Sequence, residues 1–221
     1  MIPFDLRLYG LVDPARSAGR DLAGLAAAAA RGGTTLIQLR DKTGSTRVFV
    51  EEARAVHAAL RGTGVPLLIN DRVDVALAVS AEGVHLGQDD MDARDARRQL
   101  GPHAIIGLSL KNAAHVDAAP LGALDYVAIG GVFETMSKDN PDAPVGIDGL
   151  KALVERVRAR RPDMPICAIA GITEERIPSV IGAGADGVAI ISAIFMADDP
   201  EAAARALRAT VDAALAKRGA A

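Results

Sequence analysis

A short polar cluster follows the apolar stretch that begins at Thr34. In the segment QLRDK, Gln38, Arg40 and Lys42 occupy every second position. Side chains alternate between two faces along an extended strand, so Gln38 and Arg40 point to one side, with Lys42 just beyond in the loop. An amide and two converging cations suit a polyanion such as a diphosphate. A solvated charged loop has the same composition, and this segment alone leaves both interpretations open.

Two more apolar stretches end in carboxylates. Asn70 and Asp71 follow Leu67–Ile69, and Asp90 closes the segment GQDD after Leu86. Mg2+ usually takes one or two carboxylates together with waters and substrate phosphate oxygens, and Asp71 and Asp90 fit that pattern. Capping of the following helices explains each segment equally well when it is taken alone. The two together, beside the cations, favour a metal site and a diphosphate.

A long polar segment, Gly131 to Ile147, offers hydroxyls and a further cation. Its 17 residues include Thr135, Ser137 and Lys138. Loops of this length in a compact domain are often lids or binding loops. These three side chains either clamp a phosphate or are ordinary polar loop residues.

Small and hydroxylated residues end the remaining apolar stretches. Ser109 ends the fifth, Gly171 follows the seventh, and Ile191 and Ser192 end the eighth. Backbone N–H groups and a helix N-terminus commonly bind phosphate at the last two of these places in a barrel. With the cationic group, this gives two anion sites, which indicates two phosphorylated ligands and a transfer reaction with diphosphate as the leaving group.

The elements that must position these residues alternate along the chain. Short apolar runs rich in β-branched residues are followed by alanine-rich stretches of helical length, which is typical of parallel strands with helical crossovers. The predicted strands are Leu6–Val12, Thr34–Arg40, Pro66–Asn70, Gly83–Leu86, Ala104–Ser109, Tyr126–Gly130, Pro165–Ala170 and Gly187–Ile191. The predicted helices are 17–31, 45–61, 72–80, 91–100, 112–119, 148–160, 174–183 and 199–217.

Eight such units without a linker predict an α/β protein with a single (β/α)8 TIM barrel domain over residues 1–221. Barrels of this kind begin at about 200 residues, and their active sites lie at the carboxyl ends of the strands. A doubly wound open sheet is the alternative. It requires a glycine fingerprint after the first strand, where this chain has Asp13-Pro14-Ala15-Arg16.

Composition narrows the class of protein. The net charge is −3, and the basic residues are spread along the chain, so we expect no nucleic-acid partner. No apolar run approaches the ~20 residues of a membrane span, and we expect no membrane partner. The single cysteine, Cys167, lies in an apolar run and fits a reducing compartment, so we expect a cytoplasmic protein. The oligomeric state stays open, with a homo-oligomer among the options.

The strand-end segments together resemble the thiamine phosphate synthase family. QLRDK at Gln38–Lys42 is similar to the family's Q-x-R-x-K, and Gly107-Leu108-Ser109 to its G-x-S. Order and spacing agree from about Leu8 to Pro200. Further matching segments are Ile69–Ala76 (INDRVDVA), Gly83–Asp90 (GVHLGQDD) and Gly184–Ile194 (GADGVAIISAI).

The resemblance implies the substrates, the cofactor and the role of each site residue. A pyrimidine diphosphate and a thiazole phosphate would combine through a resonance-stabilised pyrimidine methylene cation, and Mg2+ would be the cofactor. Arg40, Lys42 and Lys138 would stabilise the departing diphosphate, so they count as catalytic. The pyrimidine diphosphate would be held by Gln38, Arg40, Lys42, Asn70, Ser109 and Lys138, the metal by Asp71 and Asp90, and the thiazole phosphate by Thr135, Ser137, Gly171, Ile191 and Ser192.

This chain departs from the family pattern at a few positions. The family's G-P-x-x-P-T-x-T-K after the sixth strand has Gly131 and Glu134 in place of both prolines, and Ser137 stands for a threonine. Ala170 stands where a glycine is usual, and Lys111-Asn112 follows Leu110 where His-Thr is frequent. We assign no chemical role to the histidines, of which His85, within a strand, is the best placed.

Other functions fit these residues less well. A thiazole tautomerase-like isomerase or a non-catalytic thiazole-phosphate-binding barrel would not need the cations and carboxylates of the diphosphate half. A Schiff-base aldolase needs a lysine inside a strand, and no predicted strand interior has one. A kinase is disfavoured because the chain has no P-loop.

Overall fold

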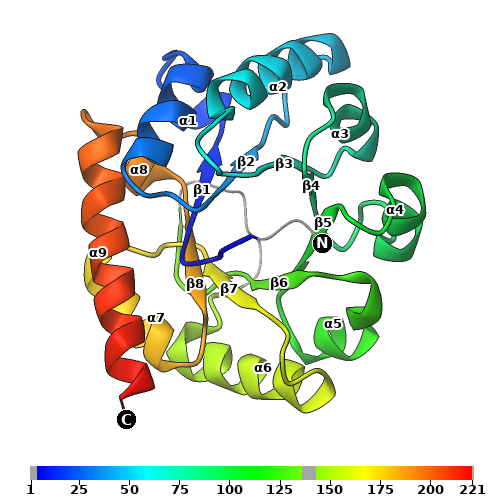
Figure 1. Cartoon of the computed structure of the whole chain (residues 1–221). Helices are drawn as coiled ribbons and strands as arrows, with labels where there is room; N and C mark the ends of the chain where they lie inside the picture. Colours follow the sequence, from blue (N-terminus) through cyan, green and yellow to red (C-terminus); the bar gives the residue numbers. More distant parts are fainter. Residues whose placement is uncertain (1–3, 136–142, 221) are drawn as a thin grey trace.

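The strands close into a barrel. The computed structural model describes residues 4–135 and 143–220, in which eight parallel strands pair in chain order and the eighth pairs with the first (Figure 1). This confirms the predicted (β/α)8 fold. The strands are β1 (Leu8–Val12), β2 (Leu36–Leu39), β3 (Leu67–Asn70), β4 (Gly83–Leu86), β5 (Ile105–Leu110), β6 (Tyr126–Ile129), β7 (Ile166–Ile169) and β8 (Gly187–Ile190).

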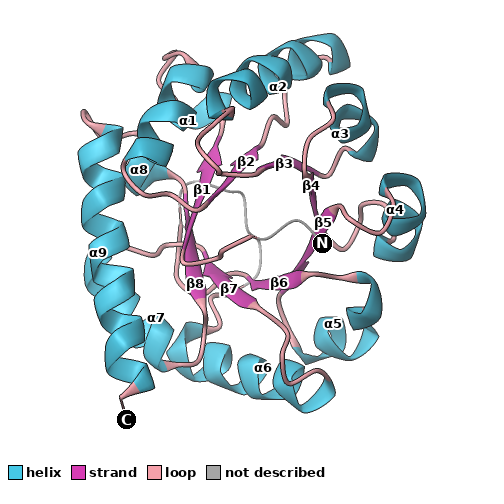
Figure 2. Cartoon of the chain, viewed as in Figure 1, coloured by secondary structure: helices cyan, strands magenta, loops and turns pink. Residues whose placement is uncertain are grey.

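Helices surround the barrel as an outer ring (Figure 2). Those between the first and the last strand connect successive strands, as parallel pairing requires, and the last two follow the eighth strand. Their bounds are α1 (Leu22–Arg31), α2 (Thr46–Leu60), α3 (Val73–Val79), α4 (Ala93–Leu100), α5 (Ala113–Ala118), α6 (Gly146–Arg160), α7 (Ile177–Gly182), α8 (Ser192–Phe195) and α9 (Pro200–Gly219). No helix of the described ranges is long and apolar enough to cross a bilayer.

The first helix begins later than the sequence predicts. A 3-10 turn covers Pro14–Arg16, and α1 starts only at Leu22. The backbone between them is left-handed at Ala18 (φ 53°) and Gly19 (φ 74°), which no α-helix accommodates. The carboxylate of Asp21 then accepts the backbone N–H groups of Ala23 and Gly24 and caps the new helix. The prediction of a helix from residue 17 was therefore wrong at its start.

The last strand is followed by a helix that the sequence did not predict. β8 ends at Ile190, and α8 occupies Ser192–Phe195 before α9 begins. In the long segment after β6, α6 begins at Gly146, so the loop ends two residues before the expected boundary at Ile147. Residues 136–142 lie outside the described part of the chain.

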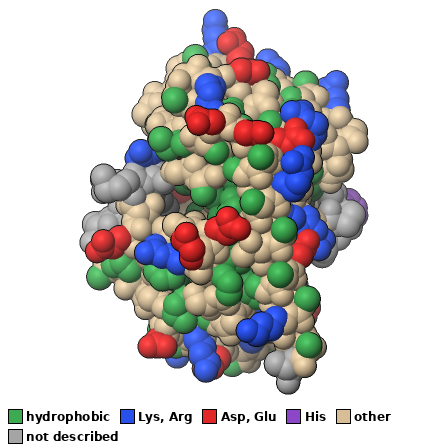
Figure 3. Space-filling view, turned by 90° about the vertical axis from the view of Figure 1, so that its left-hand side faces the viewer, with side chains coloured by type: hydrophobic (Ala, Val, Ile, Leu, Met, Phe, Trp, Pro, Cys, Tyr) green, Lys and Arg blue, Asp and Glu red, His purple; other side chains and the backbone are tan. Residues whose placement is uncertain are grey.

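Alternation along the strands creates two cores. Side chains such as Leu8, Ile37 and Ile69 face outward and pack with the helices. Every second residue points inward, where Tyr9, Leu36, Leu68, Ile105, Tyr126 and Cys167 form a second buried cluster. The outer surface is mixed in charge: on the face shown in Figure 3, acidic and basic side chains are interspersed. Ion pairs of Glu201 with Arg31 and Arg205 lie over α1 and α9.

Gly107 makes space for the largest side chain inside the barrel. A Cβ built on Gly107 would collide with the ring of Tyr126 on the neighbouring strand. Tyr126 is fully buried, so its ring has no open space into which it can move. The glycine of the G-L-S segment therefore has a packing role.

We expect Gly107→Ala to lower the free energy of unfolding by about 1–3 kcal/mol, because overpacking a close-packed core forces side chains off their preferred rotamers. Denaturant unfolding measures the change. Gly182→Ala is the matched control, since a Cβ there meets no atom within 4 Å. Equal stabilities for the two variants would contradict this packing role.

Candidate active site

One cavity of about 760 Å³ opens at the carboxyl ends of the strands. Its walls come from β1, β2, β3, β4, β5, β7, β8 and the loops that follow them. Of the thirteen site residues named from the sequence, Ser137 and Lys138 lie outside the described residues. The other eleven all line the cavity: Gln38, Arg40, Lys42, Asn70, Asp71, Asp90, Ser109, Thr135, Gly171, Ile191 and Ser192.

Two cations of this cavity, Arg40 and Lys42, pair with carboxylates. The guanidinium of Arg40 forms an ion pair with Asp13, which is buried at the end of β1. The backbone N–H of Arg40 also donates to the carbonyl of Val12, continuing the β1–β2 pairing. Lys42 is more exposed and pairs with Asp71. Arg40 is thus fixed by its surroundings, while Lys42 can reach different partners from its loop.

Neither acidic segment caps its helix. The residue before α3 is Arg72, which makes no side-chain cap bond, and α4 is capped by Asp92. Asp71 instead follows β3 with a left-handed backbone (φ 62°), a strained conformation for a residue with a Cβ. Asp90 turns back and accepts the backbone N–H of Gly87 at 2.7 Å. The alternative that Asp71 and Asp90 cap the following helices is therefore wrong.

The two carboxylates lie close enough to share a proton. Partial burial, a hydrogen bond with Asp71 and the charge of Asp71 raise the pKa of Asp90 above its ordinary value, against the opposing effects of Gly87 and Lys42. No cluster of three or more His, Cys, Asp or Glu side chains that could hold a metal occurs in the ranges 4–135 and 143–220. Two crowded carboxylates nevertheless suit Mg2+, which needs few protein ligands, and a cation would relieve their repulsion.

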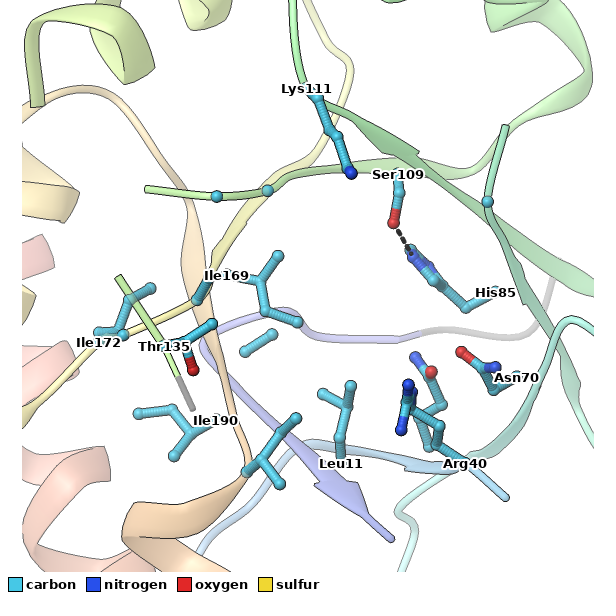
Figure 4. Close-up of a pocket in the computed structure, with 18 of the residues that line it drawn as sticks. Leu11, Arg40, Asn70, His85, Ser109, Lys111, Thr135, Ile169, Ile172 and Ile190 are labelled. Carbon is cyan, nitrogen blue, oxygen red and sulfur yellow. Dashed lines mark hydrogen bonds between the residues drawn. The ribbon is translucent and has the colours of Figure 1, made fainter. Parts of the chain in front are cut away.

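Polar side chains on the same side of the cavity come from the strands themselves. Gln38 and Asn70 are buried, and Ser109 shares a hydrogen bond of 2.9 Å with Nε2 of His85. Figure 4 shows Arg40, Asn70, His85 and Ser109 grouped on this side. Because Gln38, Asn70, His85 and Ser109 lie on strands and not on loops, the packed barrel fixes their positions.

The opposite side is built from small residues and backbone. Gly171 has a left-handed backbone (φ 64°), and a Cβ there would lie 2.8 Å from the Cβ of Phe133 and still closer to the carbonyl of Glu134. Ser192 opens the short helix α8, and Thr135 ends the described part of the β6 loop. Only a residue without a side chain allows the two loops to pack this closely.

An apolar wall separates the two sides. Leu11 and Ile169 lie between the polar group and Thr135, with Ile172 and Ile190 beside Thr135 (Figure 4). A largely apolar cavity with a few placed polar groups is the usual form of a small-molecule site.

The cavity wall also contains residues that the sequence does not predict as site residues. His85, Lys111 and Arg176 are among them. The guanidinium of Arg176 stacks on Phe133 at 4.3 Å and donates to the carbonyl of Gly171 at 2.6 Å. Arg176 comes five residues after Gly171, and Lys111 comes two after Ser109. These positions close to strand ends are the signal in the sequence that could indicate a site role. Charged residues are too common in loops for that signal to be decisive.

Comparisons with known proteins agree on one family. A family model described as thiamine monophosphate synthase matches residues 8–194. The thiamine-phosphate synthase of Agrobacterium fabrum is 56% identical over 214 residues, 97% of each chain. That of Xanthobacter autotrophicus is 48% identical over 96% of this chain and 98% of its own. The thiamine phosphate pyrophosphorylase structure from Pyrococcus furiosus aligns with a TM-score of 0.82 and 33% identity, covering 95% of this chain and 97% of that one.

Ala170 has a backbone that favours glycine (φ 88°). We expect Ala170→Gly to raise the free energy of unfolding by up to ~2.5 kcal/mol, because relief of ~1–3 kcal/mol of strain outweighs the ~0.5–1 kcal/mol entropy cost of glycine. Thermal unfolding measures the change. Gly182→Ala is the control, because it makes the opposite substitution where the backbone is not strained. If Ala170→Gly unfolded at a lower temperature than the parent protein, the backbone at Ala170 would not be strained as proposed.

The raised pKa of Asp90 makes stability depend on pH. From the ordinary value of 3.8 upward to the raised folded pKa, the folded state holds more protons than the unfolded state. The free energy of unfolding therefore falls as pH rises through this range. In metal-free buffer we expect Asp90→Asn to remove that fall, as measured by denaturant unfolding at several pH values. Asp89→Asn removes the same charge from the adjacent exposed residue, and identical pH profiles for the two variants would refute the effect.

Proposed function

The chain belongs to the thiamine monophosphate synthase family, and from this we propose that it condenses an aminopyrimidine methyl diphosphate with a thiazole ethyl phosphate. The products are thiamine phosphate and diphosphate, and the enzyme is a transferase. Its partners are these two small molecules. The observation that carries the proposal is the cavity at the strand ends, which has Arg40 and Lys42 on one side, small and hydroxylated residues on the other, and apolar side chains between them.

The reaction breaks one bond and forms another at the same carbon. The C–O bond between the pyrimidine methylene and the diphosphate breaks, and its electron pair leaves with the diphosphate. The methylene cation that remains is stabilised by the aminopyrimidine ring. The lone pair of the thiazole nitrogen then forms the C–N bond. Since that nitrogen carries no proton, no general base is needed, and the cavity works by charge stabilisation and positioning.

Arg40 and Lys42 are the residues proposed to stabilise the departing diphosphate, with Lys138 as a third cation outside the described residues. The ion pair of Arg40 with buried Asp13 supports this role, because it holds the guanidinium in one orientation before substrate arrives. Gln38, Asn70 and Ser109 would hold the aminopyrimidine beside it. Preorganised charges in a cavity of low dielectric stabilise developing charge better than water does.

Asp71 and Asp90 are the residues proposed to hold Mg2+. When bound, the ion would neutralise charge on the diphosphate oxygens. The raised pKa of Asp90 supports the assignment. In the part of the chain that the structure describes, Lys42 pairs with Asp71, and no ion pair joins a cation to Asp90. Lys42 would then be released from Asp71 and become available to the diphosphate.

Thr135, Ser137, Gly171, Ile191 and Ser192 are proposed to hold the thiazole phosphate, with Ser137 outside the described residues. Close packing at Gly171 and the start of α8 at Ser192 support a site made of backbone N–H groups and hydroxyls. The buried single cysteine supports the further proposal of a cytoplasmic enzyme, and a homo-oligomer is compatible with it.

Turnover tests the proposed function. The protein is incubated with both substrates and Mg2+, and thiamine phosphate and diphosphate are measured with and without EDTA. We expect product in the first case and its loss in the second. Binding of thiazole phosphate without product would instead support a tautomerase-like isomerase or a non-catalytic binding barrel.

The role of Lys42 gives a sharper expectation. Lys42→Ala should lower kcat by about 10²-fold or more, the usual loss for one group that stabilises transition-state charge. Lys151→Ala on the exposed face of α6 is the matched control and should keep full activity. If Lys42→Ala changed only the KM of the thiazole phosphate, the assignment of the diphosphate to the Lys42 side of the cavity would be wrong.

A further inference from the structure

A chain of hydrogen bonds crosses the barrel interior below the cavity. The amide Nε2 of Gln38 donates to the hydroxyl of Tyr9, which lies 2.9 Å from the hydroxyl of Tyr126. Tyr126 in turn lies 2.8 Å from Nδ1 of His85, and Nε2 of His85 lies 2.9 Å from the hydroxyl of Ser109. The chain therefore joins β2 to β5 through β1, β6 and β4. Its two ends are residues proposed to hold the aminopyrimidine.

The middle of this chain is sealed from water. Tyr9 and Tyr126 are 1% and 0% exposed, and their rings meet edge to face at 5.9 Å. Tyr126 also stacks on the His85 ring at 5.6 Å. Burial raises the pKa of both phenols well above the ordinary value, so both keep their protons. They are the only two tyrosines in the sequence.

The bonds fix one another's direction. If Gln38 donates to Tyr9, then Tyr9 donates to Tyr126, and Tyr126 donates to Nδ1 of His85. A neutral imidazole that accepts at Nδ1 carries its hydrogen at Nε2, so His85 donates to Ser109. Two groups at the ends keep unused hydrogen-bonding capacity. Oε1 of Gln38 is buried and has no hydrogen-bond partner among the described residues. The Ser109 hydroxyl, which accepts from His85, keeps its own hydrogen to donate.

We propose that Tyr9, Tyr126 and His85 are positioning residues that set Gln38 as an acceptor and Ser109 as a donor toward the pyrimidine, and so select an amino over an oxo substituent. The inference deepens the proposed function and rests on it. An aminopyrimidine offers an N–H donor on its amino group and an acceptor on its ring nitrogen. The oxo analogue offers a carbonyl acceptor and a ring N–H donor. Its binding would require every bond of the buried chain to reverse together, or would leave buried groups unpaired.

Interrupting the chain at its centre tests the proposal. Tyr126→Phe keeps the ring and removes the hydroxyl that joins Tyr9 to His85. For the aminopyrimidine diphosphate we expect kcat/KM to fall by about tenfold, equivalent to ~1.4 kcal/mol, with the KM of the thiazole phosphate within about twofold of the parent value. Discrimination against the oxo analogue, measured as the ratio of kcat/KM values or as relative inhibition, should fall by a similar factor.

Two controls separate positioning from general loosening of the barrel. Cys167→Ala removes a side-chain atom from the same interior cluster but removes none of the hydrogen bonds between Gln38 and Ser109. It should leave both KM values and the discrimination ratio unchanged. Tyr9→Phe keeps the Tyr126–His85 bond but disconnects it from Gln38, so nothing fixes the direction of the bonds that lead to Ser109. Discrimination should then fall about as much as in Tyr126→Phe, while the KM of the thiazole phosphate stays unchanged. Equal increases in both KM values, or unchanged discrimination in Tyr126→Phe, would overturn the proposal.

The tautomer of His85 gives a readout that does not depend on activity. In ¹⁵N NMR spectra of the imidazole rings, assigned by comparison with His85→Gln, we expect the Nε2–H form in the parent protein. An Nδ1–H form would mean that the chain runs in the opposite direction and would overturn the proposal. Absence of product from the parent protein would refute the proposed function itself, whereas product with undiminished discrimination in Tyr126→Phe would refute this inference alone.

Discussion

The parallel pairing of β8 with β1 closes the sheet, and the position of every site residue follows from that closure. In a closed parallel barrel all strands end at one rim, so residues distant in the sequence meet there. Gln38 and Ser192, 154 positions apart, line one cavity for this reason. Strand alternation adds the second condition, because only every second side chain faces inward. The helices bury the outward face and hold the strands in register.

The rim also concentrates conformational and electrostatic strain. Asp71 and Ala170 have left-handed backbones, and the carboxyl of Asp90 is crowded by that of Asp71. Such positions persist only where the surrounding structure holds them, and they are common at functional sites. The barrel wall below supplies that support through packing such as that of Gly107 against Tyr126.

Much of this architecture could be predicted from the sequence, because alternating apolar runs and helical stretches have few other solutions. The polar residues at strand ends, such as Arg40 and Asp71, could be assigned to the rim for the same reason. The chain through Tyr9, Tyr126 and His85 could not, since each lies within an apolar strand and only barrel closure brings the three rings together. The start of α1 and the existence of α8 were missed because single-residue backbone conformations, as at Gly19 and Ile191, determine them. The roles assigned to Ser137 and Lys138, which lie outside the described residues, stay predictions.

The most direct measurement is a crystal structure with Mg2+, thiamine phosphate and diphosphate bound. The account predicts the pyrimidine between Gln38 and Ser109, with its amino group donating to Oε1 of Gln38. It predicts the diphosphate beside Arg40 and Lys42, the metal on Asp71 and Asp90, and the phosphate of thiamine phosphate at Ser192. A diphosphate bound at Ser192, or a metal held by other residues, would contradict the division of the cavity from which the whole account proceeds.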